Sequence, residues 1–168
     1  MIGPEPFLVA IATIGGFYMF VEDIARFEIN PWAASATGVA AIMLAGSFGP
    51  YPLASSALAA CLMGGVVSGL RFVSPSLMGR GDYWLFAACG ALVGFEAILV
   101  FGILIGIFAL AIEAARLGLR ASGHLPPLEG AAPLPLPAAA VAMPAALIGA
   151  IARYGHGATF SDPIGWLP

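Results

Sequence analysis

The sequence predicts an all-α fold, a polytopic bundle of about six transmembrane helices. Hydrophobic residues make up 61% of the 168 residues and charged residues only 9%, whereas soluble domains carry roughly 25% charged residues. The mean hydropathy of +0.99 points the same way. At about 20 residues per span the length leaves no room for an added soluble domain, so residues 1–168 are expected to form a single integral membrane domain.

The expected helices are apolar runs bounded by charges, prolines or glycines. The first run has neither a basic segment before it nor a small-residue cleavage site after it, so we expect a retained span rather than a signal peptide. The second and third lie between Ile29 and Leu70, a stretch without any charge. The six runs are Phe7–Glu22, Pro31–Gly46, Tyr51–Leu70, Tyr83–Phe95, Ile98–Ala114 and Ala138–Ala152.

The fourth and fifth helices are separated on a length argument. As one helix, the apolar stretch from Tyr83 to Ala115 would be about 50 Å long, well beyond a hydrocarbon core of about 30 Å. Gly94-Phe95-Glu96 places a helix-weakening glycine beside a charge, so a tight turn is predicted there. In the sixth run, Pro144 is expected to kink the helix without ending it, because neighbouring helices can satisfy the freed carbonyl.

The arginines predict the orientation, since lysine is absent and all positive side chains are arginines. Five of them fall in the three loops that six spans place on one face: Arg26, Arg71, Arg80, Arg116 and Arg120. The positive-inside rule assigns these loops to the cytoplasm and both termini to the outside. Arg153, just after the last span, is the exception.

The segment 122–137 is expected to be a proline-rich cytoplasmic loop. Proline at this density excludes regular helix and favours extended backbone. The segment would serve as a stiff linker or as a cover over nearby polar groups. The more polar tail, 155–168, is expected to lie outside. His124 and His156 are interpreted as solvated loop residues rather than ligands.

Neither a metal nor an organic cofactor is predicted. Cys61 and Cys89 lie far apart in apolar runs without a C-x-x-C motif, so they are expected to be small buried residues of packed helices. The net charge of −3 comes with no basic patch. Nucleic acid is therefore not an expected partner.

Two aspartates stand out because each lies at an end of an apolar run. Asp23 follows the first run, and Asp82 opens the fourth. A carboxylate at the edge of hydrocarbon costs a few kcal/mol unless it is paired or wetted, so such acids are functional candidates. With six spans both would lie at the cytoplasmic face, where a carboxylate pair can hydrolyse a peptide bond with water. Taken singly, each could instead be a helix cap or a solvated interface residue.

The positions of the aspartates predict a division of labour. Asp82 lies near a helix N-terminus, which favours its ionised form, and Asp23 lies at a C-terminus, which opposes ionisation. The ionised acid would activate water and the protonated acid would donate to the scissile carbonyl. Gly79 and Gly81 would let the backbone of a substrate approach Asp82. Glu22 is a weaker candidate for the first acid, because it points about 100° away from Asp23 around the helix.

The residues around Asp82 resemble the GxGD segment of type IV prepilin peptidases. The similar residues are Leu77-Met78-Gly79-Arg80-Gly81-Asp82, Leu85, Ala87-Ala88 and Gly90-Ala91-Leu92. The pattern around the first aspartate of that family is similar to Asp23, Arg26, Ile29 and Asn30-Pro31, and a proline motif ahead of its last span is similar to Leu134-Pro135 with Pro137. The resemblance covers Phe7 to about Ala152. It implies an intramembrane aspartic protease with Asp23 and Asp82 as catalytic acids.

Several features of the sequence differ from the family pattern and indicate which form of the family the chain resembles. Longer bacterial members carry a cytoplasmic insertion with paired C-x-x-C motifs and methylate the new N-terminus, whereas this chain resembles the short, peptidase-only form of Flp-type pili. Trp84 stands where the family commonly has a lysine. Asn30 and Pro31 follow the reverse of the usual order.

The resemblance implies an endopeptidase of the bacterial inner membrane. It would remove the short basic leader of a pilin-like precursor at the cytoplasmic face, with that precursor and the lipid bilayer as partners. The alternative is a catalytically inactive subunit of the same fold that packs against other membrane proteins. A small transporter is a weaker third interpretation, since its acids would lie near the middle of spans.

Overall fold

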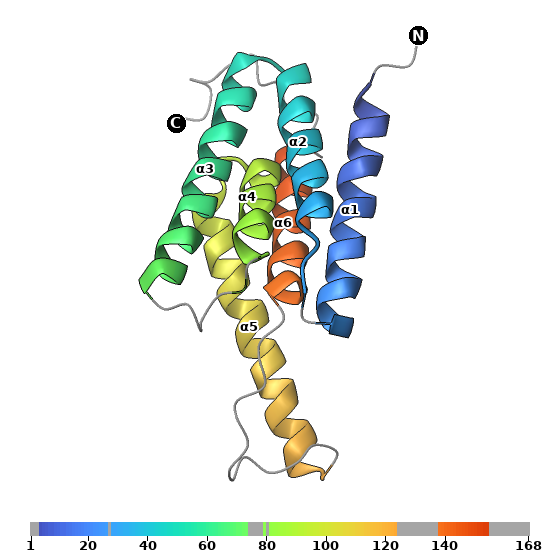
Figure 1. Ribbon diagram of the computed structural model, residues 1–168, viewed down its shortest axis with the longest axis vertical. Helices are drawn as coiled ribbons and strands as arrows, with labels where there is room; N and C mark the ends of the chain where they lie inside the picture. Colours follow the sequence, from blue (N-terminus) through green and yellow to red (C-terminus); the bar gives the residue numbers. More distant parts are fainter. Residues whose placement is uncertain (1–3, 27, 74–78, 80, 124–137, 155–168) are drawn as a thin grey trace.

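The computed structural model describes residues 4–26, 28–73, 79, 81–123 and 138–154. These residues form six α-helices and no strand (Figure 1), so the predicted all-α fold is confirmed. The predicted tail, the predicted loop from 124 onward and Arg80 lie outside the described residues. The helices are α1 (Glu5–Arg26), α2 (Pro31–Ser47), α3 (Pro50–Val73), α4 (Asp82–Val93), α5 (Ile98–Ala121) and α6 (Ala138–Tyr154).

The helices fall into two length classes. By length and composition, α1, α3 and α5 are able to cross a membrane. The others are shorter, with 17 residues in α2 and α6 and 12 in α4. At 1.5 Å per residue, α4 measures about 18 Å and does not reach across a hydrocarbon core of about 30 Å. The chain is a helical membrane protein, while six full spans with both termini outside stay a prediction.

The turn predicted at Gly94 is present. Helix α4 ends at Val93, the Gly94 N–H donates to the Gly90 carbonyl (2.8 Å), and α5 begins at Ile98. Gly94 has a φ of 76°, which glycine adopts without steric cost. Helix α6 continues through Pro144, as expected.

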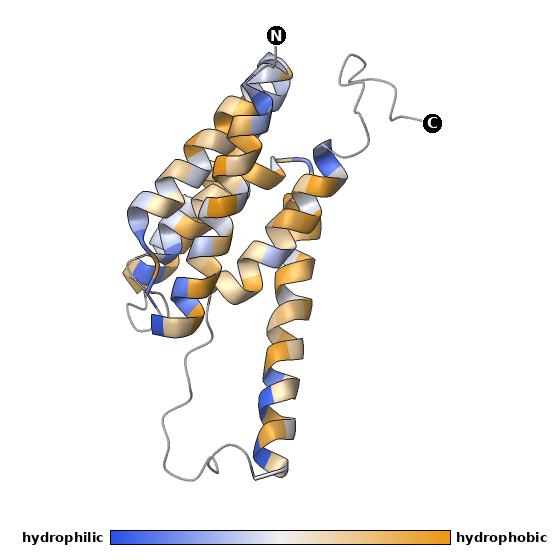
Figure 2. Cartoon of the chain, turned by 90° about the vertical axis from the view of Figure 1, so that its right-hand side faces the viewer, coloured by the Kyte–Doolittle hydropathy of each residue, from blue (hydrophilic) through white to orange (hydrophobic). Residues whose placement is uncertain are grey.

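Helix α4 forms the centre of the bundle. It packs against α3, α2 and α6, while α1 packs on α2 and α6. Because α4 is hydrophobic all round, it suits this enclosed position. Helix α5 rests mainly on α6, and Phe101 is its one buried residue. It has twice as many residues as α4, and its far half projects from the bundle (Figures 1 and 2).

Arg153, in the last turn of α6, links α6 to α3 by hydrogen bonds. Its side chain is buried, at 8% exposed, and donates to the Ser56 hydroxyl (2.8 Å) and the Pro52 carbonyl (3.1 Å) of α3. Glu96, in the α4–α5 turn, lies 3.9 Å from its guanidinium and accepts a hydrogen bond from the Ser55 hydroxyl. The Arg153 cluster, defined by these five residues, joins α3, α6 and the α4–α5 turn. Arg153 is therefore not a loop charge beyond the last span.

The two cysteines differ in their surroundings. Cys89 is fully buried in α4, with its sulfur 3.7 Å from that of Met143. Cys61 is exposed on α3, so the prediction that it is buried is wrong. The reason is that a helix at the lipid boundary keeps apolar residues on its outer face as well as its inner face.

Candidate active site

Asp23 lies in the last turn of α1, yet its side chain is only 3% exposed. One carboxylate oxygen accepts a hydrogen bond from the main-chain N–H of Ala139 (2.6 Å). Ala139 belongs to the first turn of α6, where main-chain N–H groups have no partner within their own helix. The N-terminus of α6 therefore holds the carboxylate of a residue that ends α1.

This contact changes the expected electrostatics of Asp23. The prediction placed the carboxylate in the unfavourable field of the α1 C-terminus, whereas the structure places it at the N-terminus of α6, which favours negative charge. Burial of the side chain acts in the opposite direction. Asp82 also lies at a helix N-terminus, so helix fields alone do not distinguish the two acids, and the division of labour stays a prediction.

Asp82 is the first residue of α4 and is partly exposed. Its carboxylate accepts a hydrogen bond from the main-chain N–H of Gly79 (2.7 Å). This hydrogen bond holds the Gly79 main chain against the first residue of α4. The aspartate is thus oriented by its own segment, whereas Asp23 is oriented by a distant helix.

The structure brings the two predicted aspartates to the same end of the bundle. Their carboxylates are close enough to interact electrostatically. Helices α1, α4 and α6 supply the two acids and the Ala139 amide, and the ends that carry them lie together in Figure 1. Two interacting carboxylates can share a proton and activate a water molecule between them. In the described part of the chain, no three His, Cys, Asp or Glu residues are grouped as metal ligands would be.

Gly81 makes this convergence sterically possible. A Cβ atom at Gly81 would lie 2.6 Å from the Ile29 Cβ atom and 2.7 Å from the Ile29 carbonyl oxygen. The link between α1 and α2 therefore touches the segment ahead of α4. At Gly79, which is exposed, the nearest neighbours of a Cβ atom would be the Asp82 carboxylate oxygens, at 3.5 Å. Substrate access along the two glycines stays a prediction, and Gly79 is the more open position.

Glu22, the weaker candidate, has a structural contact instead. Its carboxylate accepts hydrogen bonds from the Tyr18 hydroxyl (3.1 Å) and the main-chain N–H of Asn30 (3.2 Å). The Asn30 side chain in turn caps α2 by accepting from the Trp32 N–H (3.0 Å). Glu22 thus holds the turn that follows Asp23.

Comparison with known protein families identifies the family of the chain. A family model described as the type IV leader peptidase family matches residues 10–114. The chain belongs to this family. The matched residues include both aspartates, Gly79 and Gly81, and they end within α5, so α6 lies beyond them. The predicted family is confirmed, and a leader-peptidase type of function follows from it. Comparison with curated proteins and with solved structures gave no significant match.

Proposed function

We propose that this leader-peptidase family member is an intramembrane aspartic endopeptidase. It removes the leader from a pilin-like precursor at the cytoplasmic face of the bacterial inner membrane. The observation that carries the proposal is that Asp23 and Asp82, from separate helices, lie close enough to interact electrostatically. Membership of the leader peptidase family supplies the class of substrate.

The proposed chemistry needs one ionised and one protonated carboxyl group. The ionised group takes a proton from a water molecule, whose oxygen attacks the scissile carbonyl carbon. The protonated group donates to the carbonyl oxygen, which gives a tetrahedral diol. The diol then returns a proton to the second group as the C–N bond breaks, and the first group protonates the leaving amine. Because a coupled pair titrates as a unit, neither role is assigned to one residue.

The exposure of the two acids suggests how a substrate reaches them. Asp23 is enclosed by α1 and α6, whereas Asp82 is partly exposed and Gly79 is exposed. A peptide therefore approaches from the Gly79 side of α4. An extended chain can lie close to a glycine because no side chain intervenes.

Cleavage of a co-expressed precursor tests this proposal. Asp23→Asn and Asp82→Asn should each lower processing by at least about 100-fold, since each removes an acid or base from the reaction. Glu22→Gln is the matched control and should process normally, because Glu22 is engaged with Tyr18 and Asn30. Normal processing by either aspartate variant, present in the membrane at wild-type level, would remove the proposed role.

A non-cleaving subunit of the same fold is the second candidate. Two observations favour it: most residues of α5 are exposed, and Trp84 replaces the lysine common in the family. Copurification with another membrane protein at fixed stoichiometry, with no processing by the wild-type chain, would support this candidate against the peptidase.

A further inference from the structure

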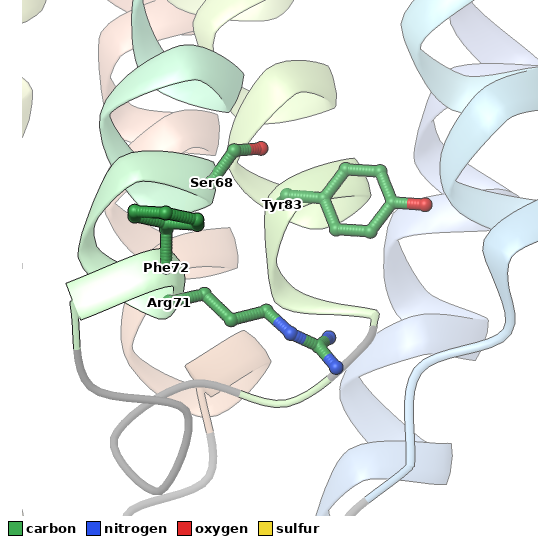
Figure 3. A pocket seen from close by; sticks show the side chains of 4 residues that line it. All are labelled: Ser68, Arg71, Phe72 and Tyr83. Atoms are coloured by element: carbon green, nitrogen blue, oxygen red, sulfur yellow. The ribbon is translucent and has the colours of Figure 1, made fainter.

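A groove between α3 and α4 lies at the end of the bundle where α4 begins. It has a volume of about 480 Å³ and is lined by Ser68, Arg71, Phe72 and Tyr83. Tyr83 directly follows Asp82 in α4. Figure 3 shows the Arg71 side chain extended across the groove, with its guanidinium group below the Tyr83 ring and the Phe72 ring on the α3 side.

The polar groups of the groove are suited to an anion. Within the described residues, no carboxylate forms an ion pair with Arg71. A guanidinium group offers five N–H donors and no acceptor, and the Ser68 and Tyr83 hydroxyl groups add further donors. Arginine binds phosphate groups with paired hydrogen bonds. Among the residues that the structure describes, the groove thus holds a cationic side chain without an ion-pair partner.

The surroundings of the groove are apolar and face outward. Phe72 and Val73, in the last turn of α3, are 90% and 82% exposed. Trp84 is also exposed, and its ring lies 4.9 Å from that of Tyr83. Tryptophan and tyrosine concentrate at the headgroup level of membranes. A ligand of this groove therefore combines an anionic head with apolar chains.

We propose that the groove binds the headgroup of an anionic phospholipid, with Arg71 on the phosphate and the acyl chains along the outer face of α3. A zwitterionic lipid fits less well, because no carboxylate is among the described lining residues to receive its ammonium group. A basic leader peptide fits less well for the same reason, since Arg71 would repel it. The binding does not depend on whether the aspartate pair cleaves a precursor.

Native mass spectrometry of the full chain, purified in detergent and titrated with phosphatidylglycerol, tests the proposal. The wild type should retain one phosphatidylglycerol, and Arg71→Gln should bind it at least about tenfold more weakly, as expected for loss of a charged hydrogen bond. Arg71→Lys, which keeps the charge but not the paired geometry, should be intermediate. Arg120→Gln, which changes an arginine of α5 outside the groove, should bind like the wild type.

Several outcomes would overturn the assignment. Equal retention of phosphatidylglycerol by the wild type and by a helical, monodisperse Arg71→Gln protein would do so. Phosphatidylcholine or inorganic phosphate bound as tightly as phosphatidylglycerol would show that the site does not select an anionic lipid. Displacement of phosphatidylglycerol by a precursor peptide, with peptide binding lost in Arg71→Gln, would assign the groove to the substrate instead.

Discussion

In the described part of the chain, main-chain groups rather than charged side chains hold Asp23 and Asp82 in place. Ala139 and Gly79 each donate an N–H to one of the carboxylates, at 2.6 and 2.7 Å. Main-chain donors cannot rotate away or titrate, so they orient the two carboxylates without adding a charge to the site. This arrangement suits a pair in which the protonation state must change during the reaction.

Substitution of Gly81 tests the close approach that brings the acids together. Gly81→Ala places a methyl group against the Ile29 backbone, so the segment ahead of α4 must move. We expect the free energy of unfolding to fall by about 1–3 kcal/mol, as for other overpacked sites, and processing to fall with it. Thermal unfolding in detergent and the precursor assay measure the two effects.

Gly65→Ala is the control for this substitution. Gly65 lies within α3, and a Cβ atom there would have no neighbour within 4 Å. Alanine should therefore leave processing unchanged and raise the stability by up to about 1 kcal/mol, because it is the better helix former. Equal losses for the two variants would mean that the Ile29 contact has no special role.

The aspartates could be found from the sequence, but their partners could not. Asp23 and Asp82 stand out because charges make up only 9% of the chain and these two lie at the ends of apolar runs. The Ala139 amide gives no sequence signal, since nearly every residue carries an N–H and this contact joins residues 116 positions apart. The same holds for the packing of Gly81 on Ile29.

At the scale of elements, α6 connects the aspartate site at one end of the bundle with the Arg153 cluster at the other. Its first turn holds Asp23, and its last turn carries Arg153 into the Arg153 cluster. Hydrogen bonds therefore fix the last turn of α6 to α3 and its first turn to α1. Loosening the Arg153 end is expected to reduce the precision with which Asp23 is placed.

Arg153→Met tests the contribution of this cluster. The variant leaves the Ser56 hydroxyl and the Pro52 carbonyl without their donor, so the free energy of unfolding should fall by about 1–3 kcal/mol. Arg26→Met changes an exposed arginine in the last turn of α1 and should stay within about 0.5 kcal/mol of the wild type. A loss for Arg153→Met no larger than that of the control would contradict the role of the cluster.

Glu96 should make the stability depend on pH. Partial burial raises the pKa of Glu96, but the Ser55 hydroxyl, a backbone N–H and the Arg153 charge outweigh it, so the pKa lies below the ordinary value of 4.5. A carboxylate with a lowered pKa stabilises the fold above its unfolded pKa, and this stabilisation is lost as the pH falls through the folded pKa. Unfolding midpoints should therefore drop below about pH 4.5 in the wild type. The drop should be smaller in Glu96→Gln, and identical pH profiles would contradict this role.

Helix boundaries were predictable where the chain changes composition. The turn at Gly94 combines glycine with a charge, and α4 and α5 meet there. The predicted end of α5 at Ala114 is wrong, because the helix continues to Ala121. The Glu113–Arg116 ion pair (2.7 Å) stabilises the charged last turns of the helix. A prediction based on apolar runs alone ends the helix before Arg116.

At the scale of the whole molecule, the hydrophilic residues gather toward helix ends and the hydrophobic residues cover the rest (Figure 2). This distribution follows from a chain that lies mostly in lipid. The composition was sufficient to predict the class of fold. The short length of α4 and the projection of α5 could not be predicted. Both depend on the tertiary packing of each helix against its neighbours, which the pattern of apolar residues does not specify.

Cysteine labelling tests the predicted orientation. Ser47→Cys, after α2, and Ser122→Cys, after α5, are matched sites, since each serine hydroxyl donates to a carbonyl three residues earlier. In a background with Cys61 and Cys89 changed to alanine, an impermeant maleimide added to intact cells should label position 47 and not position 122. Labelling of both positions or of position 122 alone would contradict the positive-inside assignment.

The convergence of the two carboxylates is tested most directly by a short thiol–thiol crosslinker in the same cysteine-free background. Asp23→Cys combined with Asp82→Cys should crosslink efficiently in native membranes, whereas Glu22→Cys with Asp82→Cys should not, because Glu22 is directed toward Tyr18 and Asn30. Efficient crosslinking of the first pair alone is the predicted result. Absence of that crosslink, or equal crosslinking of both pairs, would contradict a shared aspartate site.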